Sequence, residues 1–135
     1  MVWFLCQFPR VLSEALGKEK VYIRTIEYPL FDGDRVDILA QDHQIFSTGP
    51  DTTCYVIEVK SDKGDHEILG QLKKATIVLQ RTGESTGHWK RTVGIAIAKK
   101  YTKSGLSLLL DAGMLAFLWC EEEKSGRIWL TPAQR

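Results

Sequence analysis

Residues 54–75 read CYVIEVKSDKGDHEILGQLKKA and change their apolar pattern midway. The first seven residues are rich in β-branched and aromatic side chains, which favours a β-strand. Between residues 65 and 81 the apolar side chains recur at helical spacing, and Asp65 stands where its carboxylate can cap the helix N-terminus. The stretch therefore predicts a strand, a short loop and an amphipathic helix.

Two further strands are predicted before this one. Residues 20–30 (KVYIRTIEYPL) alternate between two sets of side chains and indicate a strand with one wet face, and residues 35–42 (RVDILAQD) indicate a second strand. Residues 31–34 (FDGD) supply the turn between them, and residues 49–51 (GPD) suit a reversal before the third strand. Together the three strands predict a β-meander.

The two ends of the chain complete the pattern. Residues 3–16 have helical spacing, with Pro9 at a boundary or kink and Gly17 as a C-terminal cap. The remaining predicted elements are a polar loop at 81–90, a strand covered on both faces at 92–98, a short helix at 102–113, and a hairpin formed by 114–122 and 127–132. This order predicts an α/β fold with a mixed β-sheet flanked by helices.

Length and composition predict one globular domain spanning residues 1–135. Apolar residues make up 44% and charged residues 26% of the chain, which is near the average for such domains. No apolar run approaches the roughly 20 residues that span a bilayer, and the N-terminus lacks the basic segment and small-residue cleavage site of a signal peptide. We therefore expect no membrane partner and a cytoplasmic location.

Cysteine and histidine do not predict a metal site. Cys6, Cys54 and Cys120 are far apart and form no C-x-x-C pair, so we expect reduced thiols rather than a disulfide framework or a zinc knuckle. The three histidines are scattered in polar segments, which favours structural or solvent-facing roles.

Three charged residues lie within the predicted strands. Glu58 and Lys60 are two residues apart, so they share one strand face with Val56. Asp37 lies inside the apolar run of the neighbouring strand, where burial without compensation is unfavourable. Two carboxylates that converge from adjacent strands offer hard oxygen ligands for Mg²⁺ or Mn²⁺, and the backbone carbonyl of Val59 is a further candidate ligand. With Lys60 beside the ion, these groups predict a phosphodiester site.

The same residues also have an ordinary structural interpretation. Glu58 and Lys60 at this spacing can form an exposed ion pair worth about 0–1 kcal/mol. Charged residues on edge strands also commonly serve to block aggregation. Spacing alone does not separate these interpretations.

Taken in order, RVDILAQD, YVIEVK and GDHEILGQL resemble the PD-(D/E)XK nuclease superfamily, in particular the archaeal Holliday junction resolvases and the nuclease domain of the NucS/EndoMS mismatch endonucleases. The resemblance implies a restriction-endonuclease-like core of the order αβββαβ. It implies Asp37, Glu58 and Lys60 as the catalytic trio. Gln71 matches the glutamine that the RecB-like branch carries on the following helix. Glu14 resembles an additional acidic residue that many members carry on the first helix, and its alternative is an exposed helical glutamate.

Two positions depart from the superfamily pattern. Val36 stands in place of the name-giving proline, and Ala75 stands in place of the tyrosine of the related Q-x-x-x-Y motif. The second departure leaves the subfamily open, and with it the preferred DNA structure.

Five residues are candidates for contact with DNA, two on the predicted helix and three beside the following strand. They are Lys73, Lys74, Trp89, Lys90 and Arg91. Lys74 shares a helix face with Gln71 and would line the substrate groove, while Lys73 would face solvent or the DNA backbone. Trp89 would stack on a base or wedge into a duplex, with its two basic neighbours on phosphates. A tryptophan that covers the core is the alternative, and the net charge of +1 does not itself indicate a polyanionic partner.

The sequence therefore predicts a DNA endonuclease, dependent on Mg²⁺ or Mn²⁺, that hydrolyses phosphodiester bonds without a covalent intermediate and works as a homodimer. Junction-, mismatch- and site-specific cleavage are all compatible with it. One alternative is a catalytically inactive DNA-binding or protein-interaction module on the same fold. Another is phosphoryl chemistry on a nucleotide, although the chain has no G-x-x-x-x-G-K-[ST] phosphate loop.

Overall fold

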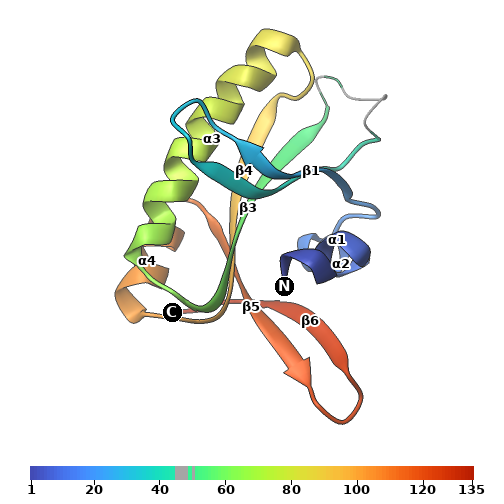
Figure 1. Cartoon of the computed structure of the whole chain (residues 1–135), viewed down its shortest axis with the longest axis vertical. Coiled ribbons are helices and arrows are strands. Elements are labelled where there is room, and N and C mark those ends of the chain that lie inside the picture. The colour runs from blue at the N-terminus through green and yellow to red at the C-terminus, as the bar shows by residue number, and fades with distance from the viewer. Residues whose placement is uncertain (45–48, 50) are drawn as a thin grey trace.

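The computed structural model describes residues 1–44, 49 and 51–135, and these form one six-stranded sheet with helices on both faces (Figure 1). The strands are β1 (Tyr22–Pro29), β2 (Arg35–Gln41), β3 (Thr53–Gly64), β4 (Arg91–Tyr101), β5 (Leu115–Glu122) and β6 (Arg127–Pro132). The helices are α1 (Val2–Gln7), α2 (Arg10–Leu16), α3 (His66–Thr86) and α4 (Lys103–Asp111). The predicted α/β fold is confirmed, while the predicted reversal at 49–51 lies partly outside the described residues.

The sheet is mixed because its strands pair in both directions. Strands β1, β2 and β3 are antiparallel neighbours, β4 and β5 run parallel to β3, and β6 returns antiparallel to β5. The strand order follows the chain order, so β3 and β4 lie at the centre. Residues 94–98 of β4 are buried, as expected of a strand covered on both faces.

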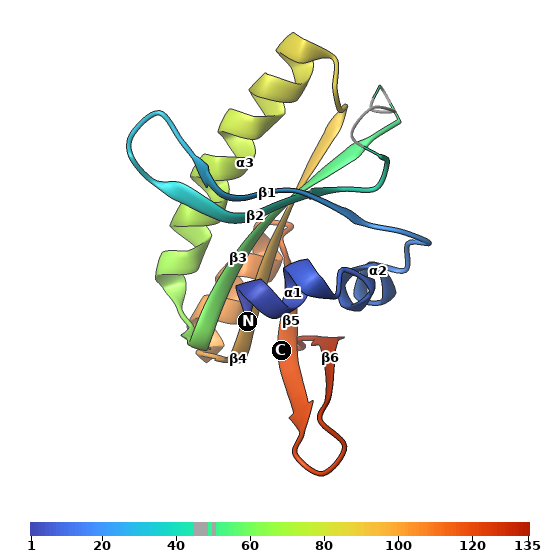
Figure 2. The same cartoon turned by 45° about the vertical axis from the view of Figure 1, so that its right-hand side comes forward.

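One part of β4 has a partner on a single side. Strand β5 begins opposite Ile95, so in the described part of the chain residues 91–94 pair with β3 alone. Beyond its pairing with β4, the β5–β6 hairpin extends away from the rest of the molecule (Figures 1 and 2). The sheet therefore has an open edge beside the start of β4.

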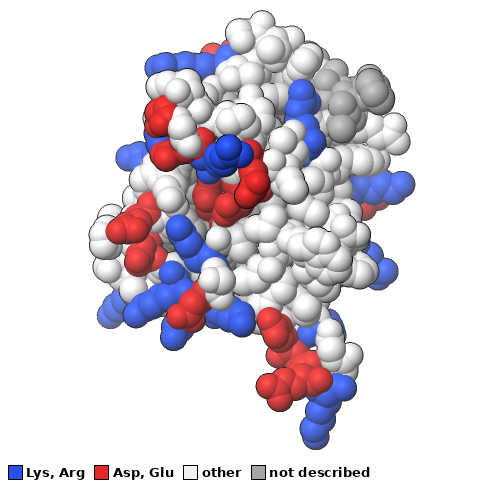
Figure 3. All heavy atoms as spheres, viewed as in Figure 1, with Lys and Arg blue, Asp and Glu red and all other residues white. Residues whose placement is uncertain are grey.

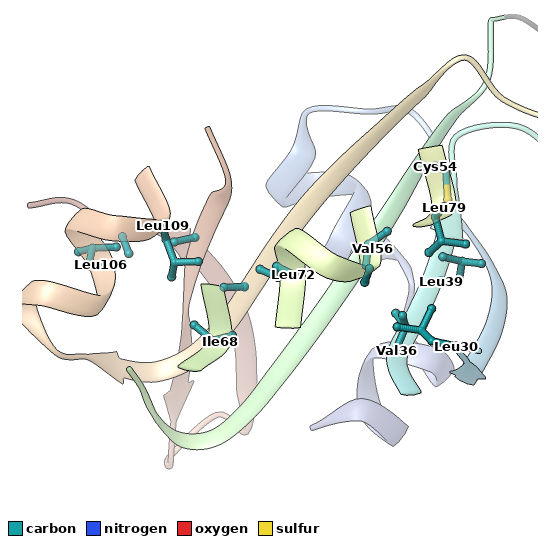
Figure 4. Close-up of a cluster of buried hydrophobic side chains, with 14 of the residues drawn as sticks. Leu30, Val36, Leu39, Cys54, Val56, Ile68, Leu72, Leu79, Leu106 and Leu109 are labelled. Atoms are coloured by element: carbon teal, nitrogen blue, oxygen red, sulfur yellow. The ribbon is translucent and has the colours of Figure 1, made fainter. Parts of the chain in front are cut away.

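Two apolar clusters pack on opposite sides of the sheet. Val56 of β3 belongs to the cluster beneath α3 and α4, whereas the next residue, Ile57, belongs to the cluster beneath α1 and α2. Figure 4 shows the first cluster, with side chains of α3 between those of α4 and those of β2 and β3. Because alternate strand residues point to opposite faces, Glu58 and Lys60 lie on the α3 side with Val56.

The N-terminal segment forms two helices, with the break at the predicted position. Helix α1 ends at Gln7 and α2 starts at Arg10, with Pro9 between them. Proline has no N–H to donate to the preceding turn, which explains the break. Gly17 closes α2 with a φ of 65°, a left-handed conformation that glycine adopts without strain.

Helix α3 begins as predicted but continues past the predicted end. Asp65 caps it through a side-chain hydrogen bond to the first turn. The prediction of a loop from residue 81 is wrong, because the helix runs to Thr86. The hydroxyl groups that favoured a loop are satisfied within the helix: Thr82 donates to the Val78 carbonyl at 3.0 Å, and Thr86 to the Thr82 carbonyl at 2.8 Å.

Strand β3 is also longer than predicted and continues past Lys60 to Gly64. Its pairing with β4 is irregular between Lys60 and Lys63 and then resumes with Lys63 opposite Lys100. Gly64 allows close packing here, since a Cβ at this position would lie 2.5 Å from the Cδ1 atom of Tyr101. The extension carries charged residues beyond the central sheet.

The three cysteines are free thiols, as the sequence predicts, and Cys54 is buried. None of the described helices is long and apolar enough to cross a membrane.

Candidate active site

Asp37 and Glu58 are neighbours on adjacent strands. The antiparallel register ends with Ile38 opposite Ile57, and continuing it by one residue would set Asp37 opposite Glu58. Residues directly opposite in an antiparallel pair project to the same face. Both carboxylates therefore lie on the α3 side of the sheet, and the Glu58 side chain is only 5% exposed.

The main-chain pairing of β2 with β3 stops just before these carboxylates, at Ile38 and Ile57. Asp37 replaces the next main-chain contact, because its Oδ2 accepts a hydrogen bond of 2.8 Å from the Val59 N–H. In an extended strand the N–H and C=O of one residue point to the same edge. The Val59 carbonyl is therefore directed toward β2 and Asp37 as well.

The electrostatics of the pair disfavour two negative charges. Burial, and after it the neighbouring Asp37 carboxylate, raise the pKa of Glu58 to about 8, although the Lys60 ammonium group acts in the opposite direction. In the described part of the chain, no ion pair includes Asp37, Glu58 or Lys60. Glu58 is therefore protonated near neutral pH unless a cation balances the pair.

The donor set fits a hard divalent cation. Two carboxylates and a main-chain carbonyl are oxygen ligands of the kind Mg²⁺ prefers, and Mg²⁺ normally keeps several waters or substrate oxygens beside one or two protein carboxylates. Among the described residues, no group of three or more His, Cys, Asp or Glu side chains could hold a metal ion. Asp37 and Glu58 therefore fit Mg²⁺ or Mn²⁺ better than a site that needs four protein side chains.

A small cavity of about 110 Å³ opens beside Glu58. It is lined by Leu30, Asp34, Arg35, Glu58, Gln71 and Lys74. The structure thus brings Gln71 and Lys74 of α3 to the same cavity as Glu58, as helical spacing predicts. Figure 3 shows acidic side chains gathered near the middle of the face in view, with basic side chains beside them.

Lys74 is already engaged by two carboxylates of the β1–β2 turn. Its Nζ donates to Asp32 Oδ2 at 2.7 Å and also to Asp34. These hydrogen bonds raise the pKa of Lys74, and the bond from Lys74 lowers the pKa of Asp32. Lys74 thus lies at the cavity as predicted, paired with two carboxylates, and its contact with DNA stays a prediction.

Three residues of this region were not found from the sequence. Asp32 and Asp34 belong to a turn, and only the fold shows that this turn reaches α3. Arg35 carried a signal, because it is two residues before Asp37 on one strand and so shares its face. The same reasoning that joined Glu58 to Lys60 would have found it.

Glu14 is not part of the site. It lies on α2, whose buried Leu12 packs in the apolar cluster on the opposite side of the sheet from Glu58. Its carboxylate accepts a hydrogen bond of 2.9 Å from Arg10, and the side chain is 62% exposed. The implied catalytic role of Glu14 is therefore corrected to that of an exposed helical ion pair.

Trp89 is a core residue. Its side chain is 4% exposed, and its Nε1 donates a hydrogen bond of 3.0 Å to the Leu79 carbonyl. The Arg24 guanidinium covers the ring at 5.3 Å from the centroid. The prediction that Trp89 stacks on a base is wrong, because its ring packs against α3 and its N–H is already bonded.

The other predicted DNA contacts lie away from the cavity. Lys73 is exposed on α3, and Lys90 and Arg91 are exposed at the start of β4. Arg91 pairs with Thr53, whereas Glu58 pairs with Ala96 near the middle of the strand. Arg91 lines a second cavity of about 430 Å³ at that end of the sheet. The structure does not bring these three basic residues to the carboxylate pair.

The chain is similar to solved structures of known proteins but matches no sequence family. No family model matches the chain, and no curated protein matches it. A repair endonuclease from Pyrococcus abyssi shares 24% identity at a TM-score of 0.60, covering 82% of this chain and 41% of the other. EndoMS, solved in complex with double-stranded DNA, shares 21% identity at a TM-score of 0.66, covering 100% of this chain and 44% of the other.

The chain thus spans less than half the length of either endonuclease. At these identities the likeness is one of fold, and it confirms the predicted resemblance to the EndoMS nuclease domain at that level. The chain has the α/β fold of these two endonucleases.

Proposed function

We propose that this protein is a metal-dependent endodeoxyribonuclease that hydrolyses phosphodiester bonds of DNA. The observation that carries the proposal is the buried Glu58 opposite Asp37, with Asp37 bonded to the Val59 N–H and Lys60 on the same face. Both structures that share the fold are of endonucleases, and one was solved with double-stranded DNA. Fold and site chemistry therefore agree on the class of reaction.

Asp37, Glu58 and the Val59 carbonyl would hold Mg²⁺ or Mn²⁺. The bound ion would stabilise negative charge on the phosphoryl group and lower the pKa of a water molecule. In the hydrolysis a water oxygen bonds to phosphorus as one P–O bond breaks, and no covalent enzyme intermediate forms.

Two further side chains act on the reacting groups. Lys60 shares the face of Glu58, where its ammonium group neutralises the phosphate or orients the attacking water. Gln71 lines the same cavity from α3, where its amide can hydrogen-bond the water or a phosphate oxygen. Both residues belong to regular elements, which fix their positions better than loops do.

The proposed assembly is a homodimer in which each chain cuts one strand. With 135 residues, one chain has a single candidate site for two DNA strands. A two-fold dimer presents two such sites to the duplex.

The test is cleavage of labelled DNA by pure protein with Mg²⁺, Mn²⁺, Ca²⁺ or EDTA, using duplex, mismatched, junction and single-stranded substrates. We expect cleavage with Mg²⁺ or Mn²⁺ and none with EDTA. Asp37→Asn, Glu58→Gln and Lys60→Gln should each lower the rate by at least about 100-fold, since each removes a group that acts on the transition state. Lys20→Gln, an exposed lysine outside the site, is the matched control.

Cleavage that survives Asp37→Asn and Glu58→Gln would place the reaction elsewhere and end the proposal. Absence of cleavage by the parent protein on every substrate, together with tight and salt-sensitive DNA binding, would indicate the non-catalytic DNA-binding module instead.

A further inference from the structure

Lysines gather where β3, β4 and the start of α4 meet. This lysine cluster consists of Lys60, Lys63, Lys100 and Lys103. Figure 3 shows basic side chains along the lower edge of this face, below its acidic centre. The cluster draws on two strands and a helix, so the fold assembles it from segments separated in sequence.

The strand register places like charges side by side within the cluster. Lys63 of β3 lies opposite Lys100 of β4. The two strand ends are held together there, because Thr102 N–H donates a hydrogen bond of 2.9 Å to the Gly64 carbonyl. Like charges directly opposite each other destabilise a sheet. The fold thus places two lysines side by side at this end of the sheet.

The acidic neighbours neutralise this cluster only weakly. Lys100 approaches Asp62 at 3.8 Å, with the two side chains 63% and 76% exposed. Exposed pairs at such distances contribute little. Lys74, by contrast, donates to two carboxylates at the cavity. The lysine cluster therefore keeps its positive charge available.

The cluster continues directly from the candidate active site. Lys60 is two residues from Glu58 on the same strand face, and Lys63 is three residues further along β3. At about 3.3 Å per strand residue, and with the irregularity between Lys60 and Lys63, Lys63 lies at most about 16 Å from Glu58. A duplex whose cut phosphate lies at Glu58 therefore has further backbone phosphates within reach of the cluster.

We propose that the lysine cluster binds backbone phosphates of double-stranded DNA beside the bond that is cut. The inference rests on the proposed function in taking DNA as the ligand. It moves the phosphate-binding surface from the start of β4, where Lys90 and Arg91 lie, to the opposite end of the same strand.

Two double variants test the surface by anisotropy of a labelled duplex in EDTA, so that binding is measured without cleavage. Lys63→Gln with Lys100→Gln removes two cluster charges, and Lys20→Gln with Lys124→Gln removes two exposed charges elsewhere. We expect the cluster variant to bind at least about tenfold more weakly at low salt and to lower the slope of log K against log[salt] by about 1.8. The control variant should keep the parent slope. The cluster variant should unfold at or above the parent melting temperature, since like-charge repulsion is relieved.

The position along the DNA is tested with duplexes that carry one uncharged methylphosphonate linkage, moved stepwise from the cleavage site. Parent protein should lose affinity when the uncharged linkage replaces a phosphate bound by the cluster, and the cluster variant should not respond to the linkage at that position. An unchanged salt slope in the cluster variant, with metal-dependent cleavage by the parent, overturns this inference and leaves the proposed function standing. A reduced slope without cleavage under any metal supports the surface and overturns the nuclease.

Discussion

Glu58 faces a second carboxylate from inside the sheet, so its proton links stability to pH. Its pKa is about 8 in the folded protein against an ordinary value of 4.5. Between these values the folded state binds more protons than the unfolded state, so the free energy of unfolding falls as pH rises. Below 4.5 the stabilising contribution is fully present, and above 8 it is lost.

We predict that Glu58→Gln removes this dependence in metal-free protein. Glutamine keeps the size of the side chain but does not ionise. In EDTA, the stability of the variant relative to the parent should rise steadily from pH 5 to pH 8. Urea unfolding at several pH values measures it, and a difference that stays constant across this range would contradict the pKa shift.

The same variant separates a metal site from an uncompensated acid pair. Saturating Mg²⁺ should raise the melting temperature of the parent, because a ligand that binds only the folded state stabilises it. Glu58→Gln removes one of the two carboxylate ligands and should abolish most of this rise. Equal shifts in both proteins would show that Mg²⁺ binds elsewhere.

At the residue scale, local spacing was enough for some positions only. The two-residue period of a strand predicted that Glu58 and Lys60 share one face of β3. Helical spacing predicted that Gln71 and Lys74 share one face of α3. The structure agrees with both predictions. Spacing does not show what a side chain meets across the fold. Nor does a family resemblance or a basic neighbourhood show it: Glu14, assigned by resemblance, lies on the opposite side of the sheet, and Trp89, a candidate for base stacking, is in the core.

Helix α3 contains two glycines whose surroundings differ sharply. A Cβ at Gly83 would lie 2.2 Å from Nε1 of Trp89, which is buried and hydrogen-bonded, whereas a Cβ at Gly70 would meet no atom within 4 Å. The indole of Trp89 thus packs directly against the helix backbone at Gly83. Gly70 has no such packing role.

We predict opposite effects of alanine at these two sites. Gly83→Ala should destabilise the protein by about 1–3 kcal/mol through overpacking. Gly70→Ala should stabilise it by about 0.5–1 kcal/mol, since alanine loses less backbone entropy in a helix. Urea unfolding followed by circular dichroism measures both. A neutral Gly83→Ala would mean that the Trp89 ring can move away.

The β1–β2 turn reaches α3 through Lys74, which predicts a neutralising role for that lysine. Lys74→Gln leaves the carboxylates of Asp32 and Asp34 unbalanced beside the cavity, so DNA should bind more weakly. Adding Asp32→Asn and Asp34→Asn to the same variant should restore the parent Kd to within about twofold, the usual scatter of additive effects. A triple variant that stays as weak as Lys74→Gln would instead assign Lys74 to a phosphate.

At the element scale, the order and type of the helices and strands could be read from the sequence, whereas some ends could not. The strand 54–60 and the helix 65–81 both run further than predicted. Thr82 and Thr86 favour turns in isolation, but here their hydroxyls bond within the helix. Trp89 then covers the helix end, a contact that no local pattern contains.

The proposed homodimer can be tested by mixing active and inactive chains. In a homodimer that cuts both strands, with about one active chain in ten, only about one dimer in a hundred holds two active sites. An excess of Glu58→Gln protein should therefore suppress double-strand breaks far more than single-strand nicks. Gel analysis of a supercoiled plasmid distinguishes the two products. Equal suppression of both would favour a chain that acts alone.

For the molecule as a whole, apolar periodicity and the strand–helix–strand order were sufficient for the fold class. The chain order already places Lys90 and Arg91 at the start of β4 and Lys100 and Lys103 near its other end. It could not place Lys63 beside Lys100, because that follows from the register between β3 and β4.

The open edge at the start of β4 suggests a second role for Lys90 and Arg91. A strand whose outer N–H and C=O groups lack a partner can pair with a second molecule and start an aggregate. Lys90 and Arg91, exposed beside residues 91–94, place repelling charges where such pairing would begin. The cations first assigned to nucleic acid would then keep the protein in solution at high concentration.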